Sequence, residues 1–466
     1  MVFSSLTFLF VFVPLVFGIY YIVPAKAKNI IIFLSGFIFY AWGEPFYICI
    51  MILSTLIDYT AGLLLARYDK NPKVRTILLL VSVVMNLSLL ATFKYSSFII
   101  NNINAILHTS IPDPNLPLPI GISFYTFQSM SYTIDLYMRK INVQKNLINF
   151  VSYVTLFPQL VAGPIVRYQD VQNEIDHRTI TVTKVSAGIG LFIQGLAKKV
   201  LLANNIGLLW TNIKAMDYAT MPAMTAWLGI LAFTFQIYYD FSGYSDMACG
   251  LGKMLGFEFP QNFNLPYTAK SIAEFWRRWH ITLSSWFKSY VYFPLGGSRV
   301  SKPKIVRNLL IVWGLTGLWH GASWNFILWG LYFGILIICE RFIWGKALQK
   351  LPGIIQHIYT FVLVVFGWML FEILTVTDII TYTKALFGAG GLWDSQSFYF
   401  LSSYFILFII CAIFSGGFLQ RLGTKLAARF PKAVPYSIPV VQLVLMVCCL
   451  SYLVSSTYNP FLYFRF

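Results

Sequence analysis

The stretch IVWGLTGLWHGASWNFILWGLYFGILII, residues 311–338, decides the class of fold, because it is long, apolar and free of Asp, Glu, Lys and Arg. A helix rises about 1.5 Å per residue, so a single helix over 308–340 would be longer than the ~30 Å hydrocarbon core of a bilayer. The segment is basic at both ends, at Arg307 and Arg341, and basic residues favour the cytoplasmic side. We therefore interpret 308–340 as a re-entrant pair of shorter helices.

The two helices are expected to meet near Gly317 and Gly321, which places His320 at their join. The glycines would permit the break and a close approach of substrate. Ionisable groups at this depth are costly and are usually functional. A neutral imidazole can take a proton from a hydroxyl at physiological pH, so we expect His320 to be a general base. The alternative is a neutral histidine that is hydrogen-bonded to a neighbouring helix. A metal site is disfavoured, because no Cys, Asp or second His lies close by in the sequence.

The composition indicates a membrane protein throughout. The 466 residues are 58% hydrophobic and 11% charged, and the mean hydropathy is +0.69. The apolar residues fall into many runs, each long enough to cross a bilayer as a helix. The alternating strands of a transmembrane barrel, each about 10 residues long, are not seen. The six cysteines lie in apolar segments without metal spacing and are interpreted as small buried hydrophobes.

The positions of Lys and Arg predict the topology. We expect one domain, 1–466, with about ten spans, both termini outside the cell and the first run retained as a span. The spans are expected at about 2–23, 29–42, 45–66, 76–93, 118–138, 185–213, 224–251, 355–375, 399–419 and 437–457. A second re-entrant element is expected at 146–165, which contains Pro158, Gly163 and Pro164. Lys198 and Lys199 are expected to interrupt the span at 185–213.

A net charge of +17 suggests nucleic acid in a soluble protein, but here it favours cytoplasmic loops that face anionic lipid. The most polar segment, 253–307, is rich in Lys and Arg and contains only two acids, Glu258 and Glu274. We expect it to be cytoplasmic or to lie at the membrane interface. Ser271 and Glu274 form a capping-box pattern at the start of a helix.

That segment contains FWRRWHITLSSWF, residues 275–287, with His280 beside Arg277 and Arg278. One interpretation is an aromatic and basic helix anchored to lipid headgroups. The other is functional: the two arginines would receive the phosphates of a nucleotide-bearing donor, and His280 would approach the same cavity.

Two further segments carry polar side chains inside predicted spans. The first holds Asp240, Ser242, Tyr244, Ser245 and Asp246. Its carboxylates are expected to pair with arginine or to line a wet cavity, and a structural network is favoured over a substrate role.

The second holds Ser123, Gln128 and Asp135. Ser123 has no neighbouring base in the sequence, so we interpret these residues as polar contacts between helices and not as a nucleophilic site.

The chain also resembles the membrane-bound O-acyltransferase family, and within it the bacterial alginate O-acetyltransferase group. The motifs that carry this resemblance run nearly from end to end: GISFYTFQSMSYTID, FPQLVAGPIVR, DFSGYSDMACGLGKMLGF, NFNLPYTAKSIAEFWRRWHITLSSWF, YFPLGG, GLWHGASWNFILWG and PFLYFRF. The resemblance implies a ring of membrane helices around a central tunnel, with His320 as the essential histidine and His280 as a second one. The candidates for substrate or donor binding are Trp276, Arg277, Arg278, Asp240, Ser242, Tyr244, Asp246, Asn262 and Trp319.

The resemblance further implies a multi-pass protein of the bacterial plasma membrane with no bound cofactor. Its donor would be a cytoplasmic thioester, which is acetyl-CoA or another acyl thioester, and its acceptor would be an extracytoplasmic polysaccharide. A separate hydrolase-like protein would often complete the transfer. Direct transfer is favoured over an acyl-enzyme, since no Cys or Ser is obviously activated.

Three other functions stay open at this point. One is D-alanyl transfer to teichoic acid. Another is a transporter of polysaccharide precursors in which His320 relays protons, although the deep carboxylates gather around Asp240 and Asp246 instead of following a path. A structural scaffold for a secreted partner is the least favoured, because it would not need His320.

Overall fold

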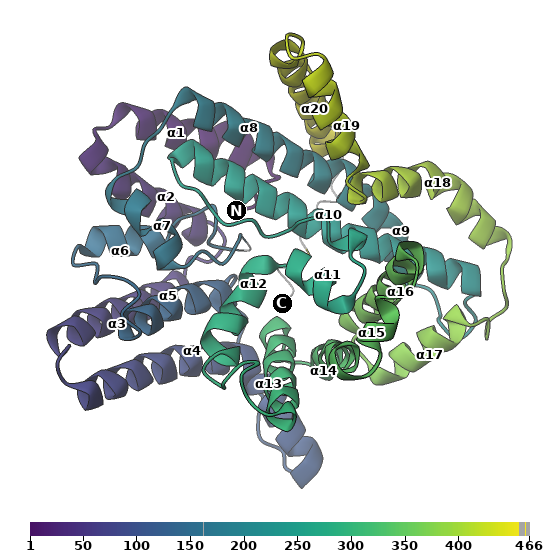
Figure 1. Cartoon of the computed structure of the whole chain (residues 1–466), viewed down its shortest axis with the longest axis horizontal. Helices are drawn as coiled ribbons and strands as arrows, with labels where there is room; N and C mark the ends of the chain where they lie inside the picture. The colour runs from purple at the N-terminus through teal and green to yellow at the C-terminus, as the bar shows by residue number, and fades with distance from the viewer. Residues whose placement is uncertain (162, 456–461, 463–466) are drawn as a thin grey trace. The chain divides into compact units, whose positions relative to one another are not determined.

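The computed structural model describes residues 1–161, 163–455 and 462, and within these ranges the regular structure is helical, with no strand (Figure 1). The predicted all-α class is therefore confirmed. The chain forms two compact units. Unit 1 comprises Met1–Phe192 and Tyr244–Pro260, and unit 2 comprises Ile193–Gly243 and Gln261–Phe466. The prediction of a single membrane domain is not tested by this division.

Unit 1 is built mainly from the N-terminal helices. They are η1 (Phe8–Phe12), α1 (Val13–Ile22), η2 (Ala25–Ala27), α2 (Lys28–Ala41), α3 (Ile48–Arg67), α4 (Pro72–Leu107), α5 (Ile122–Tyr137), α6 (Leu147–Val154) and α7 (Tyr168–Asp176). The first part of α8 (Val182–Ala197) and the last part of α10 (Ala223–Leu255) complete it. Gly188 of α8 and Gly250 of α10 let these two helices pack closely, because a Cβ on either glycine would lie 2.6 Å from the carbonyl oxygen of the other (Figure 1).

Polar side chains connect α3, α4 and α5 in the interior of unit 1. The Asp58 carboxylate accepts hydrogen bonds from Ser82 Oγ at 2.6 Å and from Asn86 Nδ2 at 2.9 Å. Ser54 donates to Asn86 Oδ1 at 2.6 Å, and Ser82 Oγ lies 3.2 Å from Thr133 Oγ1 of α5. Buried polar groups must find partners of this kind, so the network fixes how the three helices pack.

Unit 2 contains the rest of the chain. Its elements are η3 (Lys198–Ala203), α9 (Asn204–Lys214), η4 (Pro266–Thr268), α11 (Ile272–Arg278), α12 (Ile281–Phe287), η5 (Lys288–Tyr292), α13 (Lys302–His320), α14 (Trp324–Cys339), η6 (Glu340–Trp344), α15 (Gly345–Leu348), α16 (Gly353–Glu372), α17 (Val376–Leu386), α18 (Ser395–Ser415), α19 (Phe418–Arg429) and α20 (Val434–Ser455), together with parts of α8 and α10. Asn325 of α14 donates to the Phe371 carbonyl of α16 at 2.9 Å.

Seven helices among the described residues are long and apolar enough to cross a membrane. They cover Ile48–Arg67, Pro72–Leu107, Val182–Lys214, Trp324–Leu348, Gly353–Glu372, Ser395–Ser415 and Val434–Ser455. The multi-pass prediction is confirmed, whereas the ring of ten spans around a tunnel stays a prediction. Six of these helices correspond to predicted spans. Trp324–Leu348 was predicted as half of the re-entrant pair, and Phe8–Ile22 is a shorter apolar helix.

Two details differ from the predicted course of the chain. The span expected at 76–93 is part of α4, which continues to Leu107 as a helix of 36 residues. The lysines at 198 and 199 do not interrupt the helix. They open a π-helical turn, η3, within continuous helical structure over Val182–Lys214, and such turns often mark functional sites.

The predicted break within 146–165 is present. Helix α6 ends at Val154, and residues 155–161 and 163–167 contain no helix. Pro158, Gly163 and Pro164 lie in this part, where proline removes a hydrogen-bond donor and disfavours helix before it.

Candidate active site

His320 lies where the sequence predicted a break, as the last residue of α13. Gly321 is extended, and α14 begins at Trp324. The His320 side chain is buried, at 3% exposure. Its ring centroid lies 4.8 Å from that of Trp329 and 5.3 Å from that of Phe371. The imidazole therefore sits among aromatic rings that keep bulk water away from it.

Two glycines hold α13 and α14 against each other. A Cβ on Gly317 would lie 2.4 Å from the Phe326 carbonyl oxygen, and a Cβ on Gly330 would lie 2.4 Å from the Trp313 carbonyl oxygen. Backbone atoms cannot move aside easily, so only glycine permits this approach. Gly317 was expected to permit the break, but it is helical and serves the contact between the helices.

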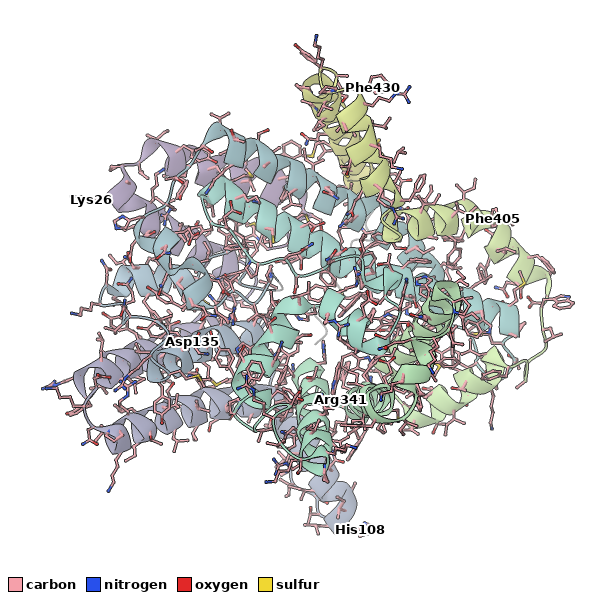
Figure 2. All side chains as sticks on the ribbon, viewed as in Figure 1. Lys26, His108, Asp135, Arg341, Phe405 and Phe430 are labelled. Carbon is pink, nitrogen blue, oxygen red and sulfur yellow. The ribbon has the colours of Figure 1, made fainter. Side chains whose placement is uncertain are left out.

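The outer ends of this helix pair lie together, as a re-entrant pair requires. Arg341, which follows α14 and is labelled in Figure 2, donates to Ser298 Oγ at 3.4 Å just before α13. Both ends therefore lie on the same side of the pair. Its position within a membrane stays a prediction.

His280 lies between α11 and α12 in an unusual backbone conformation, with φ of 42°. A residue other than glycine adopts this left-handed region at an energetic cost, and such residues gather at functional sites. His280 Nδ1 lies 3.0 Å from Asn262 Oδ1, which also accepts a hydrogen bond from Thr282 Oγ1 at 2.9 Å. Because an amide oxygen only accepts, Nδ1 carries the proton and Nε2 presents its lone pair.

The Nε2 atom of His280 is buried and has no hydrogen-bond partner among the described residues. Burial lowers the pKa of His280 to about 3, because desolvation disfavours the charged ring. His280 is therefore neutral at physiological pH and can accept a hydrogen bond from a bound molecule.

Trp319 connects the two histidines. Its ring centroid lies 5.0 Å from that of His320 and 5.9 Å from that of His280. Trp276 of α11 joins the same cluster through Trp329, with centroids 5.5 Å apart. The structure thus brings together five of the predicted site residues: His320, His280, Trp319, Asn262 and Trp276.

The two predicted arginines have different surroundings. Arg278 pairs with Glu274, Nη2 to Oε1 at 2.8 Å, and also donates to the Asn264 carbonyl. Arg277 is exposed and forms no hydrogen bond or ion pair with any described residue. Of the two, Arg277 is therefore the one with donors available to a ligand.

Arg277 lines a cavity of about 540 Å³ in unit 2. Its walls include Lys270, Ser271, Glu274, Arg277, Glu340, Arg341, Lys346, Gln349 and Gln356. The two acids are occupied, since Glu340 accepts from the Ile272 and Ala273 amides and Glu274 from Arg278. The four cations therefore give the cavity a positive character.

Asp240 is held by a residue that the sequence did not suggest as its partner. Lys199 Nζ lies 2.5 Å from Asp240 Oδ1, with both side chains 2% exposed. The Leu462 amide donates to Asp240 Oδ2 at 2.9 Å. An ionic partner was expected, and it is a lysine instead of an arginine. Ser242, two residues on, is also buried.

Tyr244 and Asp246 belong to unit 1, unlike the other candidates. Tyr244 is buried and stacks on Phe3, with ring centroids 4.4 Å apart. The C-terminal motif PFLYFRF lies outside the described residues, except for Leu462.

The polar residues of α5 make contacts between segments of unit 1. Ser123 Oγ accepts from Lys94 Nζ at 2.9 Å, Gln128 donates to the Tyr153 carbonyl at 2.9 Å, and Asp135 lies 3.4 Å from Lys140 Nζ. These contacts agree with the interpretation as polar links between helices.

Sequence reasoning missed Trp329, Phe371 and Lys199. A tryptophan or phenylalanine in an apolar helix looks the same in the sequence whether or not it packs against a distant histidine, so these two contacts could not be predicted. Lys199 did give a signal, because a lysine inside an apolar run requires a partner.

Comparison with known proteins gives a consistent result. The membrane-bound O-acyltransferase family matches residues 38–380. A probable alginate O-acetylase from Azotobacter vinelandii is 41% identical, over 80% of this chain and 75% of its own. One from Pseudomonas putida is 37% identical over 100% of both chains. A peptidoglycan O-acetyltransferase from Helicobacter pylori is 33% identical, over 84% of this chain and 81% of its own.

Proposed function

The chain belongs to the membrane-bound O-acyltransferase family, and on this basis we propose that it transfers acetyl from acetyl-CoA on the cytoplasmic side to polysaccharide hydroxyls outside the bacterial plasma membrane. The names of the relatives support acetyl as the group and a glycan as the acceptor. They favour this function over D-alanyl transfer to teichoic acid.

The observation that carries the proposal is the position of His320. It ends a helix, is buried, and is surrounded by Trp319, Trp329 and Phe371. A site of this kind excludes water, which would otherwise hydrolyse a thioester. A neutral imidazole there can act as a base toward a hydroxyl.

The reaction needs one base and no covalent enzyme intermediate. His320 takes the proton of the acceptor hydroxyl while the oxygen bonds to the thioester carbonyl carbon. The tetrahedral intermediate then breaks its C–S bond, and the leaving thiolate receives the proton from the imidazolium. The products are an acetyl ester of the acceptor hydroxyl and free CoA.

His280 has a positioning role in this mechanism. Its low pKa makes it a weak base, so we assign it no proton transfer. The Nε2 lone pair of His280 is oriented through the Asn262 contact and is available to accept a hydrogen bond from substrate. Because Trp319 contacts both rings, one substrate would meet both histidines.

The cationic cavity beside α11 is the proposed docking place for the phosphates of acetyl-CoA. Arg277, Lys270, Arg341 and Lys346 offer charge-assisted hydrogen bonds to phosphate oxygens. Helix α11 connects this cavity with the aromatic cluster, since Arg277 lines the cavity and Trp276 packs beside Trp329. The phosphates would then bind at one side of α11, and the acetyl group would extend past α11 to the two histidines.

The hydroxyl that reacts at His320 belongs either to the polymer itself or to a separate hydrolase-like protein, which then passes the acetyl group to the polymer. The acceptor class is an alginate-like exopolysaccharide or a cell-wall glycan. The test below therefore uses whole cells, in which any such protein is present.

The test compares cells that lack the chain with cells that express wild type, His320→Asn or a control, His108→Asn. His108 is an exposed histidine at the end of α4 (Figure 2). Alkali-released acetate from surface polysaccharide should be restored by wild type and by the control, and should stay at background with His320→Asn at equal membrane abundance. Restoration of acetate by His320→Asn would refute the mechanism.

A further inference from the structure

A second large cavity lies in unit 1, away from the aromatic cluster in sequence. Its volume is about 940 Å³, and its lining comes from three segments of unit 1. They are η2 with the start of α2, the start of α6, and the end of α7 with the residues that follow it. The polar lining residues are Lys26, Lys28, Asn29, Asn146, Asn149, Asp176, His177, Arg178 and Thr179. Nothing in the acetyl-transfer mechanism uses this cavity.

Three cations of this cavity lack an anionic partner. Lys26 and Lys28 form no ion pair or hydrogen bond with any described residue. Lys28 Nζ lies 4.7 Å from the centroid of the Tyr20 ring. Asp176 is the only acid in the lining, and its Oδ1 already accepts from Asn149 Nδ2 at 2.9 Å. The cavity therefore carries positive charge that the described protein does not neutralise.

Arg178 is held in place at the cavity wall. Its Nε donates to Tyr20 Oη at 2.7 Å, and its Nη1 donates to the Glu174 carbonyl at 3.1 Å. The guanidinium also lies 5.0 Å from the centroid of the Phe257 ring. These contacts use Nε and Nη1, so the Nη2 group remains for a ligand. An arginine fixed in this way suits phosphate recognition, because little freedom is lost on binding.

The N-terminus of helix α2 lies at the cavity, because its first residue, Lys28, is part of the lining. The N-terminus of a helix is the positive end of its dipole and favours anions. A lysine there is unfavourable unless an anion binds nearby.

Strongly exposed apolar residues adjoin the cavity along the chain. Ile22, at 85% exposure, precedes the lining residue Ala25 by three positions, and Val182, at 87% exposure, follows the lining residue Ile180 by two. A free phosphate has no use for such residues, whereas the acyl chains of a lipid would cover them. The basic residues also lie on the side that the positive-inside rule assigns to the cytoplasm.

We propose that this cavity of unit 1 binds the phosphate-bearing headgroup of an anionic phospholipid. Arg178, Lys26 and Lys28 contact the phosphate, and Ile22 and Val182 lie against the acyl chains. The site is independent of acetyl transfer, so it stands or fails separately from the proposed function.

The test measures lipid binding to the delipidated full chain in detergent by native mass spectrometry. Dioleoylphosphatidylglycerol is the anionic probe and dioleoylphosphatidylcholine the zwitterionic one. The double variant Lys26→Gln/Lys28→Gln should bind phosphatidylglycerol at least about tenfold more weakly, since each lysine near the headgroup contributes appreciably to binding of anionic lipid. Thr179→Glu adds a carboxylate to the lining and should also weaken the binding of phosphatidylglycerol.

The matched control is Lys70→Gln/Lys73→Gln. It removes two exposed lysines from the same predicted side of unit 1 but outside the cavity. This control should bind phosphatidylglycerol like wild type. If both double variants lost phosphatidylglycerol binding equally, the proposal would be overturned, because the lipid would then be held by general charge attraction. Equal binding of phosphatidylcholine by wild type would also overturn it, as would displacement of the lipid by millimolar inorganic phosphate.

Discussion

Lys199 Nζ lies 2.5 Å from the Asp240 carboxylate, and both side chains are almost completely buried. The pair joins η3 to α10 within unit 2. Asp240 was a candidate for binding substrate, which stays a prediction, and its ion pair with Lys199 gives it a structural contact as well. Removing one member leaves the other charge buried and unpaired, which is far more costly than replacing both members with apolar groups.

Single variants of this pair should therefore be strongly destabilised. We expect Lys199→Met or Asp240→Leu to lower the free energy of unfolding by about 3–5 kcal/mol, and the combined variant to recover most of that loss. Thermal unfolding in detergent can be followed with a thiol-reactive dye as the rise in labelling above that of the exposed Cys49 and Cys448, because the buried Cys411 becomes accessible. If the combined variant is folded but inactive, Asp240 has a role beyond structure.

The protonation of His280 should make stability depend on pH. Its pKa is about 3 in the folded protein and about 6.5 when unfolded. At a pH between these two pKa values only the unfolded state protonates His280, so the folded protein loses stability as the pH falls below 6.5. His280 alone should lower the free energy of unfolding by about 2 kcal/mol when the pH falls from 7 to 5.

The control for that pH dependence is His280→Asn, because asparagine tolerates the left-handed backbone conformation at this position. Thermal unfolding of the variant should vary less between pH 7 and pH 5 than that of wild type. Identical pH profiles would contradict the burial argument.

Much of this site could be predicted because its signals are local. A charge-free run longer than a bilayer, with arginines at both ends, predicted the break at His320. The capping pattern at Ser271 predicted the start of α11, where Ser271 accepts from the Glu274 amide at 3.0 Å. Such features depend on residues a few positions apart, which a sequence displays directly.

The rest depends on tertiary contacts. The rings of Trp329 and Phe371 around His320 come from two other helices, α14 and α16. Glu340, at the end of α14, caps α11 by accepting from the Ile272 amide at 2.7 Å. The left-handed conformation of His280 follows from packing, because local propensity argues against it. Hydropathy also cannot locate the end of α4, since a helix may continue past the apolar part of its sequence.

Arg277 should contribute to donor binding without contributing to folding. We expect Arg277→Gln to raise the KM for acetyl-CoA about tenfold, since one charge-assisted hydrogen bond is lost, with kcat and thermal stability little changed. Arg299→Gln removes an exposed arginine of the same predicted cytoplasmic segment outside the cavity, so its KM should match wild type. A KM that is unchanged in Arg277→Gln would remove the cavity from the proposed donor path.

The contact between α13 and α14 can be tested with two glycines of the same helix. A Cβ on Gly317 would meet the Phe326 carbonyl oxygen at 2.4 Å, whereas a Cβ on Gly314 would meet nothing within 4 Å. Gly317→Ala should therefore force the helices apart, lower the free energy of unfolding by about 1–3 kcal/mol and displace His320 from its aromatic neighbours. Gly314→Ala should be neutral or slightly stabilising, because alanine favours helix. Thermal unfolding and acetate transfer measured on both variants check this. Equal behaviour of the two would mean that the close approach at Gly317 positions neither the helix pair nor the histidine at its end.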